Sequence, residues 1–162
     1  MTTIACKWVY LLILAIWLGS IIFFSFVVAP TIFKVLEPQD AARLQRALFP
    51  KYYLVGIVCA AVGIVCIAYL LGEGVIRTPA AILSLLLLAG CGAANLWMRQ
   101  GVVPQMVQIR EKVAAARQAG QELAPDLEAD WKAMHRLSVQ VNGAVLLCGL
   151  VLVFVFVYAR VV

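Results

Sequence analysis

The sequence has few charged residues for its length. Asp, Glu, Lys and Arg make up 13% of its 162 residues, whereas hydrophobic residues make up 65%. A soluble domain has roughly 25% charged and about 45–50% apolar residues. A chain this short could not bury so much apolar surface in a core of its own. The shortage of charge therefore argues against an ordinary soluble fold and predicts a protein that has lipid as its solvent.

Motifs that carry catalysis or cofactor binding are also missing. The sequence contains no G-x-x-x-x-G-K-[ST] phosphate-binding loop and no H-E-x-x-H zinc motif. It has one histidine, His135, so a haem held by two histidines of one chain is excluded. A serine hydrolase also needs a carboxylate that orients its histidine, and none stands beside His135 in its polar stripe, although Glu128 and Asp130 lie nearby in the sequence. The sequence thus predicts neither enzyme activity nor a bound cofactor.

Cysteine is present, but not in a pattern typical of disulfides or structural zinc. There are five cysteines, no C-x-x-C occurs, and four of the five lie in apolar runs. Cys59 and Cys66 are two helical turns apart, about 10 Å, so they cannot grip one ion by themselves. Haem bound by His135 and a methionine, or copper(I) bound by soft ligands, remains a third hypothesis for function. The candidate methionines are Met98, Met106 and Met134.

Four long apolar runs contain no Lys, Arg, Asp or Glu. They cover residues 8–33, 52–71, 79–98 and 137–158. A helix needs about 20 apolar residues to cross a hydrocarbon core of roughly 30 Å. The runs lack the in-and-out alternation of barrel strands. The first run exceeds the 7–15 residues, roughly, of a signal-peptide core, so we expect it to be retained. The sequence predicts an all-α membrane protein, a four-transmembrane-helix bundle forming a single domain over residues 1–162.

Lys and Arg are distributed unequally between the connections. The first connection, 34–51, and the third, 99–136, hold ten of them, whereas the remaining segments outside the runs hold three. Connections rich in Lys and Arg stay in the cytoplasm. We therefore expect a multi-pass protein of the bacterial inner membrane with both termini on the periplasmic or exterior side. This reading explains the net charge of +5 without a nucleic-acid partner.

The third connection is the one sizeable polar segment. Apolar residues from Met106 to Ala116 recur at helical spacing, opposite Arg110, which predicts an amphipathic helix. Gly120 is expected to end this helix. A second helix is expected to begin near Pro125, a favourable first-turn residue, and to run into the fourth span. The result would be a cytoplasmic helical hairpin, or alternatively a docking surface for a partner protein.

The first connection is shorter and carries leucines among charged residues. This pattern predicts a short helix that lies on the inner surface of the membrane. Pro50 is expected to end that helix before the second span begins.

Few polar side chains occur at membrane depth, and they gather toward the cytoplasmic half. The candidate pocket residues are His135, Ser138, Asn142, Asn95, Pro30 and Tyr52. The first three are spaced i, i+3, i+7, so they share one face of the fourth helix. Pro30 frees a backbone carbonyl near the end of the first helix. These residues would line a polar pocket open to the cytosol; alternatively, the Asn and Ser side chains are hydrogen-bonding glue between helices.

Three segments of the sequence resemble a family of small four-helix membrane proteins that includes human transmembrane protein 205. They are Trp17–Phe33, with its Ala29-Pro30 pair, Ala47–Tyr53, and His135–Asn142, with its H-x-x-S-x-x-x-N pattern. The resemblance covers essentially the whole chain and implies the same four-helix architecture. It implies no activity for bacterial members. The human member is associated with tolerance of a platinum drug, but this chain lacks a dense Cys or Met ligand array.

The sequence leaves three hypotheses for function. The first is a membrane module related to small-ligand or solute binding or transport, with a cytosol-facing polar pocket. The second is a structural or accessory subunit, or a homo-oligomer, which docks a membrane partner through residues 99–136. The third is the handling of haem or copper.

Overall fold

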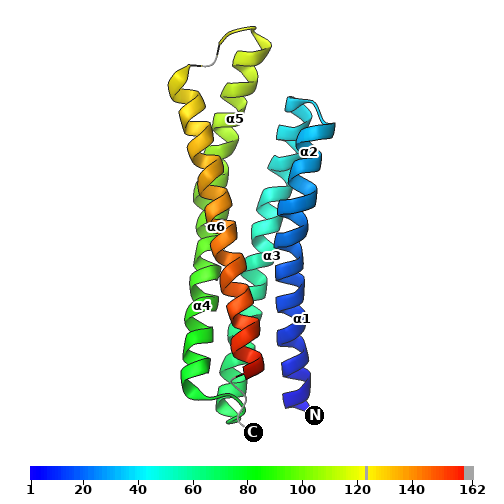
Figure 1. Cartoon of the computed structure of the whole chain (residues 1–162), viewed down its shortest axis with the longest axis vertical. Helices are drawn as coiled ribbons and strands as arrows, with labels where there is room; N and C mark the ends of the chain where they lie inside the picture. The colour runs from blue at the N-terminus through cyan, green and yellow to red at the C-terminus, as the bar shows by residue number, and fades with distance from the viewer. Residues whose placement is uncertain (123, 159–162) are drawn as a thin grey trace.

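A computed structural model of the chain describes residues 1–122 and 124–158 and consists of four long helical stretches (Figure 1). Two of these stretches contain a short π-helical turn, η1 and η2. The first comprises α1 (Thr2–Phe23), η1 (Phe24–Val28) and α2 (Ala29–Val35). The second is α3 (Pro38–Gly72), the third comprises α4 (Thr78–Trp97), η2 (Met98–Val102) and α5 (Val103–Gln118), and the fourth is α6 (Pro125–Tyr158).

All four stretches are long and apolar enough to cross a membrane. Much of their apolar surface faces outward, because only 22% of the most apolar window is buried in the first and fourth stretches. Lipid can cover such a surface, whereas water cannot do so without cost. These helices are those of a multi-pass membrane protein, which confirms the predicted number of spans. The stretches are longer than the predicted spans, so each continues beyond its apolar run.

The connections divide the bundle into two different ends. The turns between α2 and α3 and between α5 and α6 lie at one end, which we call the hairpin end (Figure 1). The N-terminus, the α3–α4 turn and Tyr158 lie at the other, the terminal end. Gly120 follows α5 with φ of +65°, a conformation that favours glycine. The break at Gly120 and the start of α6 at Pro125 agree with the sequence prediction.

The first connection does not form a separate helix on the membrane surface, and that prediction is wrong. α3 begins at Pro38 and continues through Pro50 without a break. A proline inside a helix removes one backbone hydrogen bond and costs about 3 kcal/mol. Packing offsets this cost, because Ala41 and Gln45 are buried on the extended part of α3. An ion pair between Arg46 and Glu111 also joins this part of α3 to α5.

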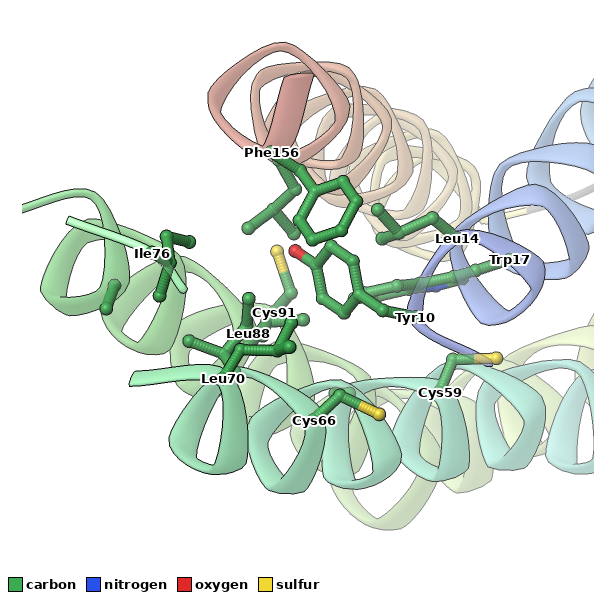
Figure 2. Packing of buried hydrophobic residues seen from close by; sticks show 14 of the residues in the cluster. Tyr10, Leu14, Trp17, Cys59, Cys66, Leu70, Ile76, Leu88, Cys91 and Phe156 are labelled. Carbon is green, nitrogen blue, oxygen red and sulfur yellow. The ribbon is translucent and has the colours of Figure 1, made fainter. Parts of the chain in front are cut away.

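The main core lies toward the terminal end. Tyr10, Leu14, Trp17 and Ile21 follow one another at helical spacing and form the buried face of α1. In Figure 2 the Tyr10 ring faces Phe156 of α6, and the two ring centroids are 4.7 Å apart. Buried residues of α3 and α4, among them Leu70, Leu88 and Cys91, complete this core (Figure 2).

A second, smaller core lies toward the hairpin end. It contains Tyr53, Met98, Val102, Val103 and Met106, which come from α3, η2 and α5. The turn η1 lies in the corresponding part of the first stretch and ends two residues before Pro30. Single π-helical turns often occur at functional sites. Both turns lie in the half of the bundle that contains the cavity described next.

Candidate functional site

A cavity of about 440 Å³ lies between the first helical stretch and α6, in the half of the bundle toward the hairpin end. This volume is within the range of small-molecule sites, roughly 300–1,000 Å³. Its walls include Phe24, Phe26 and Pro30 of the first stretch, Gln45 and Phe49 of α3, Met106 and Arg110 of α5, and His135, Ser138, Asn142 and Gly143 of α6. Segments far apart in the sequence therefore contribute to one chamber.

Four of the six predicted pocket residues line this cavity. They are Pro30, His135, Ser138 and Asn142. The i, i+3, i+7 spacing on α6 does place its three polar residues on one wall. Ser138 is 6% exposed, whereas His135 is exposed at the molecular surface. Asn142 is half-buried, so Ser138 is the most deeply buried polar residue of the α6 wall.

Tyr52, the fifth predicted residue, does not line the cavity but contacts residues that do. Its hydroxyl donates a hydrogen bond to Asn142 Oδ1 across 3.3 Å. Its ring stacks on Phe24 of η1, with centroids 4.6 Å apart. Tyr52 therefore links α3 to both sides of the cavity and holds the Asn142 amide in place.

Asn95, the sixth, does not line the cavity. It is buried between α3 and α4, and its Nδ2 donates to the Cys91 carbonyl across 2.8 Å. A Cβ at Gly56 would lie 2.5 Å from Asn95 Oδ1, so the two helices touch at this point. Asn95 therefore contributes to the α3–α4 contact by packing, because Gly56 leaves the space that its amide fills, whereas its hydrogen bond to Cys91 stays within α4.

Arg110 is the cavity residue that the sequence analysis placed wrongly. It was expected on the solvent face of α5, opposite Met106, yet both residues line the cavity. Its guanidinium carbon lies 5.5 Å from the centroid of the Phe49 ring and 4.8 Å from that of Trp131. Two aromatic rings from two other helices thus hold the cation by cation–π attraction.

The positive charge of Arg110 has no anionic partner in the described part of the chain. None of the ion pairs there involves Arg110, and the neighbouring Glu111 pairs with Arg46. The Nε atom of Arg110 is buried and has no hydrogen-bond partner. The guanidinium of arginine keeps its proton in proteins. Arg110 therefore remains a cation at neutral pH, with donors free for a ligand.

Gln45 is the second cavity residue that the sequence analysis missed. It is 2% exposed and lies on the same face of α3 as Ala41 and Phe49, at spacings of four residues. That stripe is visible in the sequence, but only if residues 38–51 are joined to the second span as one helix. The i, i+4 spacing of Met106 and Arg110 is the matching signal on α5.

The remaining walls suit an apolar ligand better than a metal ion. Aromatic and aliphatic side chains, such as Phe24, Phe26 and Leu146, form much of the lining. Among residues 1–122 and 124–158, no three His, Cys, Asp or Glu side chains gather as they would around a metal ion. Met98 and Met106 are buried in the second core. Met106 also lines the cavity together with His135, so the haem or copper hypothesis stays a prediction.

Comparison with known proteins places the chain in a family. The relatives include an uncharacterized protein of Aquifex aeolicus (strain VF5), 44% identical over 54 residues, which are 33% of this chain and 41% of that protein. The chain thus matches less than half of that relative's length. No solved structure matches. These matches do not name the transmembrane protein 205 family. Residues 12–115, from α1 to α5, match the domain of unknown function DUF4149, and since this is more than half of the chain, the protein belongs to the DUF4149 family.

Proposed function

We propose that the protein is a membrane-embedded binding module whose cavity takes a small ligand or solute. The observation that carries this proposal is the cavity itself. It has the size of a ligand site and brings a polar wall on α6 against an aromatic wall on η1. Ligand pockets are typically apolar with a few convergent polar groups, and this one has that composition.

The proposal includes the orientation of the bundle. The two connections that hold ten of the thirteen Lys and Arg residues lie at the same end of the molecule (Figure 1). The positive-inside rule would place this hairpin end in the cytoplasm of a bacterial inner membrane. The cavity would then open toward the cytoplasmic leaflet and the cytosol.

Docking of a partner protein through residues 99–136 has less support. That hypothesis depended on the charges of the amphipathic helix. Arg110 faces the cavity, and Glu111 is paired with Arg46. Two charges of α5 are therefore engaged within the bundle.

Gly143 allows the cavity to be filled without disturbing the bundle. It lies on the cavity wall, and a Cβ there would meet no atom within 4 Å. We expect Gly143→Leu to fold normally and to occupy the chamber with its side chain. Gly19→Leu is the matched control, because Gly19 is also an exposed helical glycine in open space, but not on the cavity wall.

Native mass spectrometry of the full chain, released from its membrane in a mild detergent, tests the proposal. We expect a non-covalent adduct on the wild type and on Gly19→Leu, with a loss of at least about tenfold in occupancy on Gly143→Leu. Equal adduct occupancy on all three proteins, or no adduct on the wild type, would contradict a ligand-binding cavity.

A further inference from the structure

We infer that the ligand of this cavity is a lipid with an anionic head group, whose acid group pairs with Arg110 and whose acyl chain lies in the apolar chamber. This inference rests on the proposed function and names the ligand class. The residues at one end of the cavity indicate the anionic head group, and those at the other end indicate the acyl chain.

The head-group end is defined by Arg110. A largely buried cation without a counter-ion is costly, and an anion from outside would offset that cost. Phe49 and Trp131 fix the guanidinium between them, so its remaining N–H groups have a defined direction. A planar guanidinium can bind the two oxygens of a phosphate or carboxylate at once. The site thus has a pre-positioned donor for an anion.

The rings that hold this cation lie outside the apolar runs, on the hairpin side. Phe49, which contacts Arg110, is three residues from Tyr52, where the second apolar run begins, a rise of about 4.5 Å. The head-group layer is roughly 5–7 Å thick on each side of the hydrocarbon core. Helical side chains also tilt toward the N-terminus of their helix, which for α5 is the direction of the apolar run. On its own helix Arg110 is twelve residues beyond Met98, where the third apolar run ends, a rise of about 18 Å. Because its side chain reaches back toward the run, the guanidinium lies on the hairpin side of the hydrocarbon core, where the head group of a lipid can extend toward it.

The end of the cavity that would hold the acyl chain is apolar and reaches the lipid-facing surface. Phe24 and Phe26 line it on one side, and Val139 and Leu146 line it on the other. Phe26 is 71% exposed and Val139 is 58% exposed, although both belong to the cavity wall. The cavity is thus open along the side where η1 and α6 face each other. An acyl chain can enter there from the bilayer without crossing water.

Polar side chains of the cavity can also pair with the part of a lipid that joins its head group to its acyl chain. Asn142, Ser138 and the buried Gln45 line the cavity together with Arg110. Hydroxyl and ester groups of a lipid glycerol unit need hydrogen-bond partners of this kind when they leave water. Free phosphate could pair with Arg110 but would leave the apolar chamber without a partner.

The test uses delipidated full-length protein in a neutral detergent, titrated with three probes and followed by native mass spectrometry. The probes are 1-palmitoyl-lysophosphatidate, the uncharged monopalmitoylglycerol and inorganic phosphate. We expect the wild type to bind the lysophosphatidate at least about tenfold more tightly than either of the others, because hydrogen bonds to charged groups contribute about 1.5–3 kcal/mol.

Arg110→Met is the informative variant, since methionine retains an apolar stem between the two rings but removes the charge. We expect a loss of at least about tenfold in lysophosphatidate affinity, with monopalmitoylglycerol binding unchanged. Arg43→Ala is the control, because Arg43 is an exposed arginine of the same end of the bundle. Arg110→Lys preserves the charge and should retain part of the affinity, which provides a readout if the Met variant folds poorly.

The outcomes separate this inference from the proposed function. Equal binding of the lysophosphatidate by wild type and Arg110→Met, together with a loss in Gly143→Leu, would overturn the anionic assignment and leave the binding function intact. If inorganic phosphate bound as tightly as the lysophosphatidate, the inference that the anion belongs to a lipid would be wrong. No binding of any probe by the wild type would contradict both.

Discussion

At the residue scale, the hydrogen bond between Tyr52 and Asn142 is the link that holds the cavity wall. The Tyr52 hydroxyl reaches across from α3 to the α6 amide over 3.3 Å. The same ring stacks on Phe24. One side chain therefore fixes both an amide donor and an aromatic wall, and its two contributions can be separated by substitution.

We expect Tyr52→Phe to retain the stacking and to lose the hydrogen bond. The free energy of unfolding should fall by about 0.5–1.5 kcal/mol, with the long donor–acceptor distance favouring the lower part of that range. Unfolding in mixed micelles with increasing sodium dodecyl sulfate measures this difference.

Tyr158→Phe is the control for this prediction, because Tyr158 is 73% exposed. We expect no change in its unfolding. A Tyr52→Phe protein that unfolds at the same detergent fraction as the wild type would show that the hydroxyl does not stabilise the wall.

Arg110 and Gln45 show why polar residues of a site are difficult to assign from one sequence. A charged residue on an amphipathic helix is normally assigned to the solvent face. Whether it turns inward depends on the rings that meet it, and Phe49 and Trp131 come from two other helices. The i, i+4 spacing of Met106 and Arg110 indicates a shared helix face, but it does not report which rings meet that face. The three polar residues of α6 lie on one cavity wall, as their spacing along an apolar helix predicted.

At the element scale, the contact between α3 and α4 depends on small residues. Gly56 makes room for Asn95, and Ala60 packs against Gly92, where an added Cβ would lie 3.2 Å from the Ala60 Cβ. Gly56 and Ala60 are four residues apart, so the sequence alone places them on one face of a helix. Their partners on α4 cannot be read from the sequence in this way, because they depend on the register between the two helices.

We expect Gly56→Ala to destabilise the bundle by about 1–2 kcal/mol. The new Cβ would lie 2.5 Å from Asn95 Oδ1, so the amide must move and weaken its hydrogen bond to Cys91. Overpacking of this kind typically costs about 1–3 kcal/mol, and the better helix propensity of alanine offsets part of it. Unfolding by sodium dodecyl sulfate gives the value.

Gly90→Ala is the matched control, because Gly90 lies on α4 with no atom within 4 Å of an added Cβ. Its stability should stay equal to that of the wild type or rise by up to about 1 kcal/mol. Equal stability of the two alanine variants would contradict the proposed close contact at Gly56.

The helix α3 illustrates the limits of local rules. Pro50 predicts a helix end, and the leucines of residues 36–48 predict a surface helix, yet α3 continues through both. The helix continues because Ala41 and Gln45 are buried on the extended part of α3. Tertiary packing overrides the local preference, and a sequence window of one helix cannot include that packing. By contrast, Gly120 and Pro125 act at a turn, where local chemistry does decide.

At the scale of the whole molecule, the two ends of the bundle differ in packing. The terminal end is filled by the main core around Tyr10, Trp17 and Leu88, as Figure 2 shows. The half toward the hairpin end contains a smaller core and the cavity. The sequence predicted the four spans well, because lipid demands long apolar helices whatever their neighbours. It also predicted a polar pocket in one half of the bundle, but not the apolar walls that Phe24, Phe26 and Leu146 contribute to the cavity there.

The central claim is that an anionic lipid occupies this volume. The most direct measurement is a crystal structure of the full chain with a lysophosphatidate whose acyl chain carries bromine. We predict an anomalous bromine peak in the chamber between Phe26 and Val139, with the phosphate in ion-pair contact with Arg110. A chamber without bromine signal, with the bromine peaks only on the outer faces of the helices, would contradict the claim.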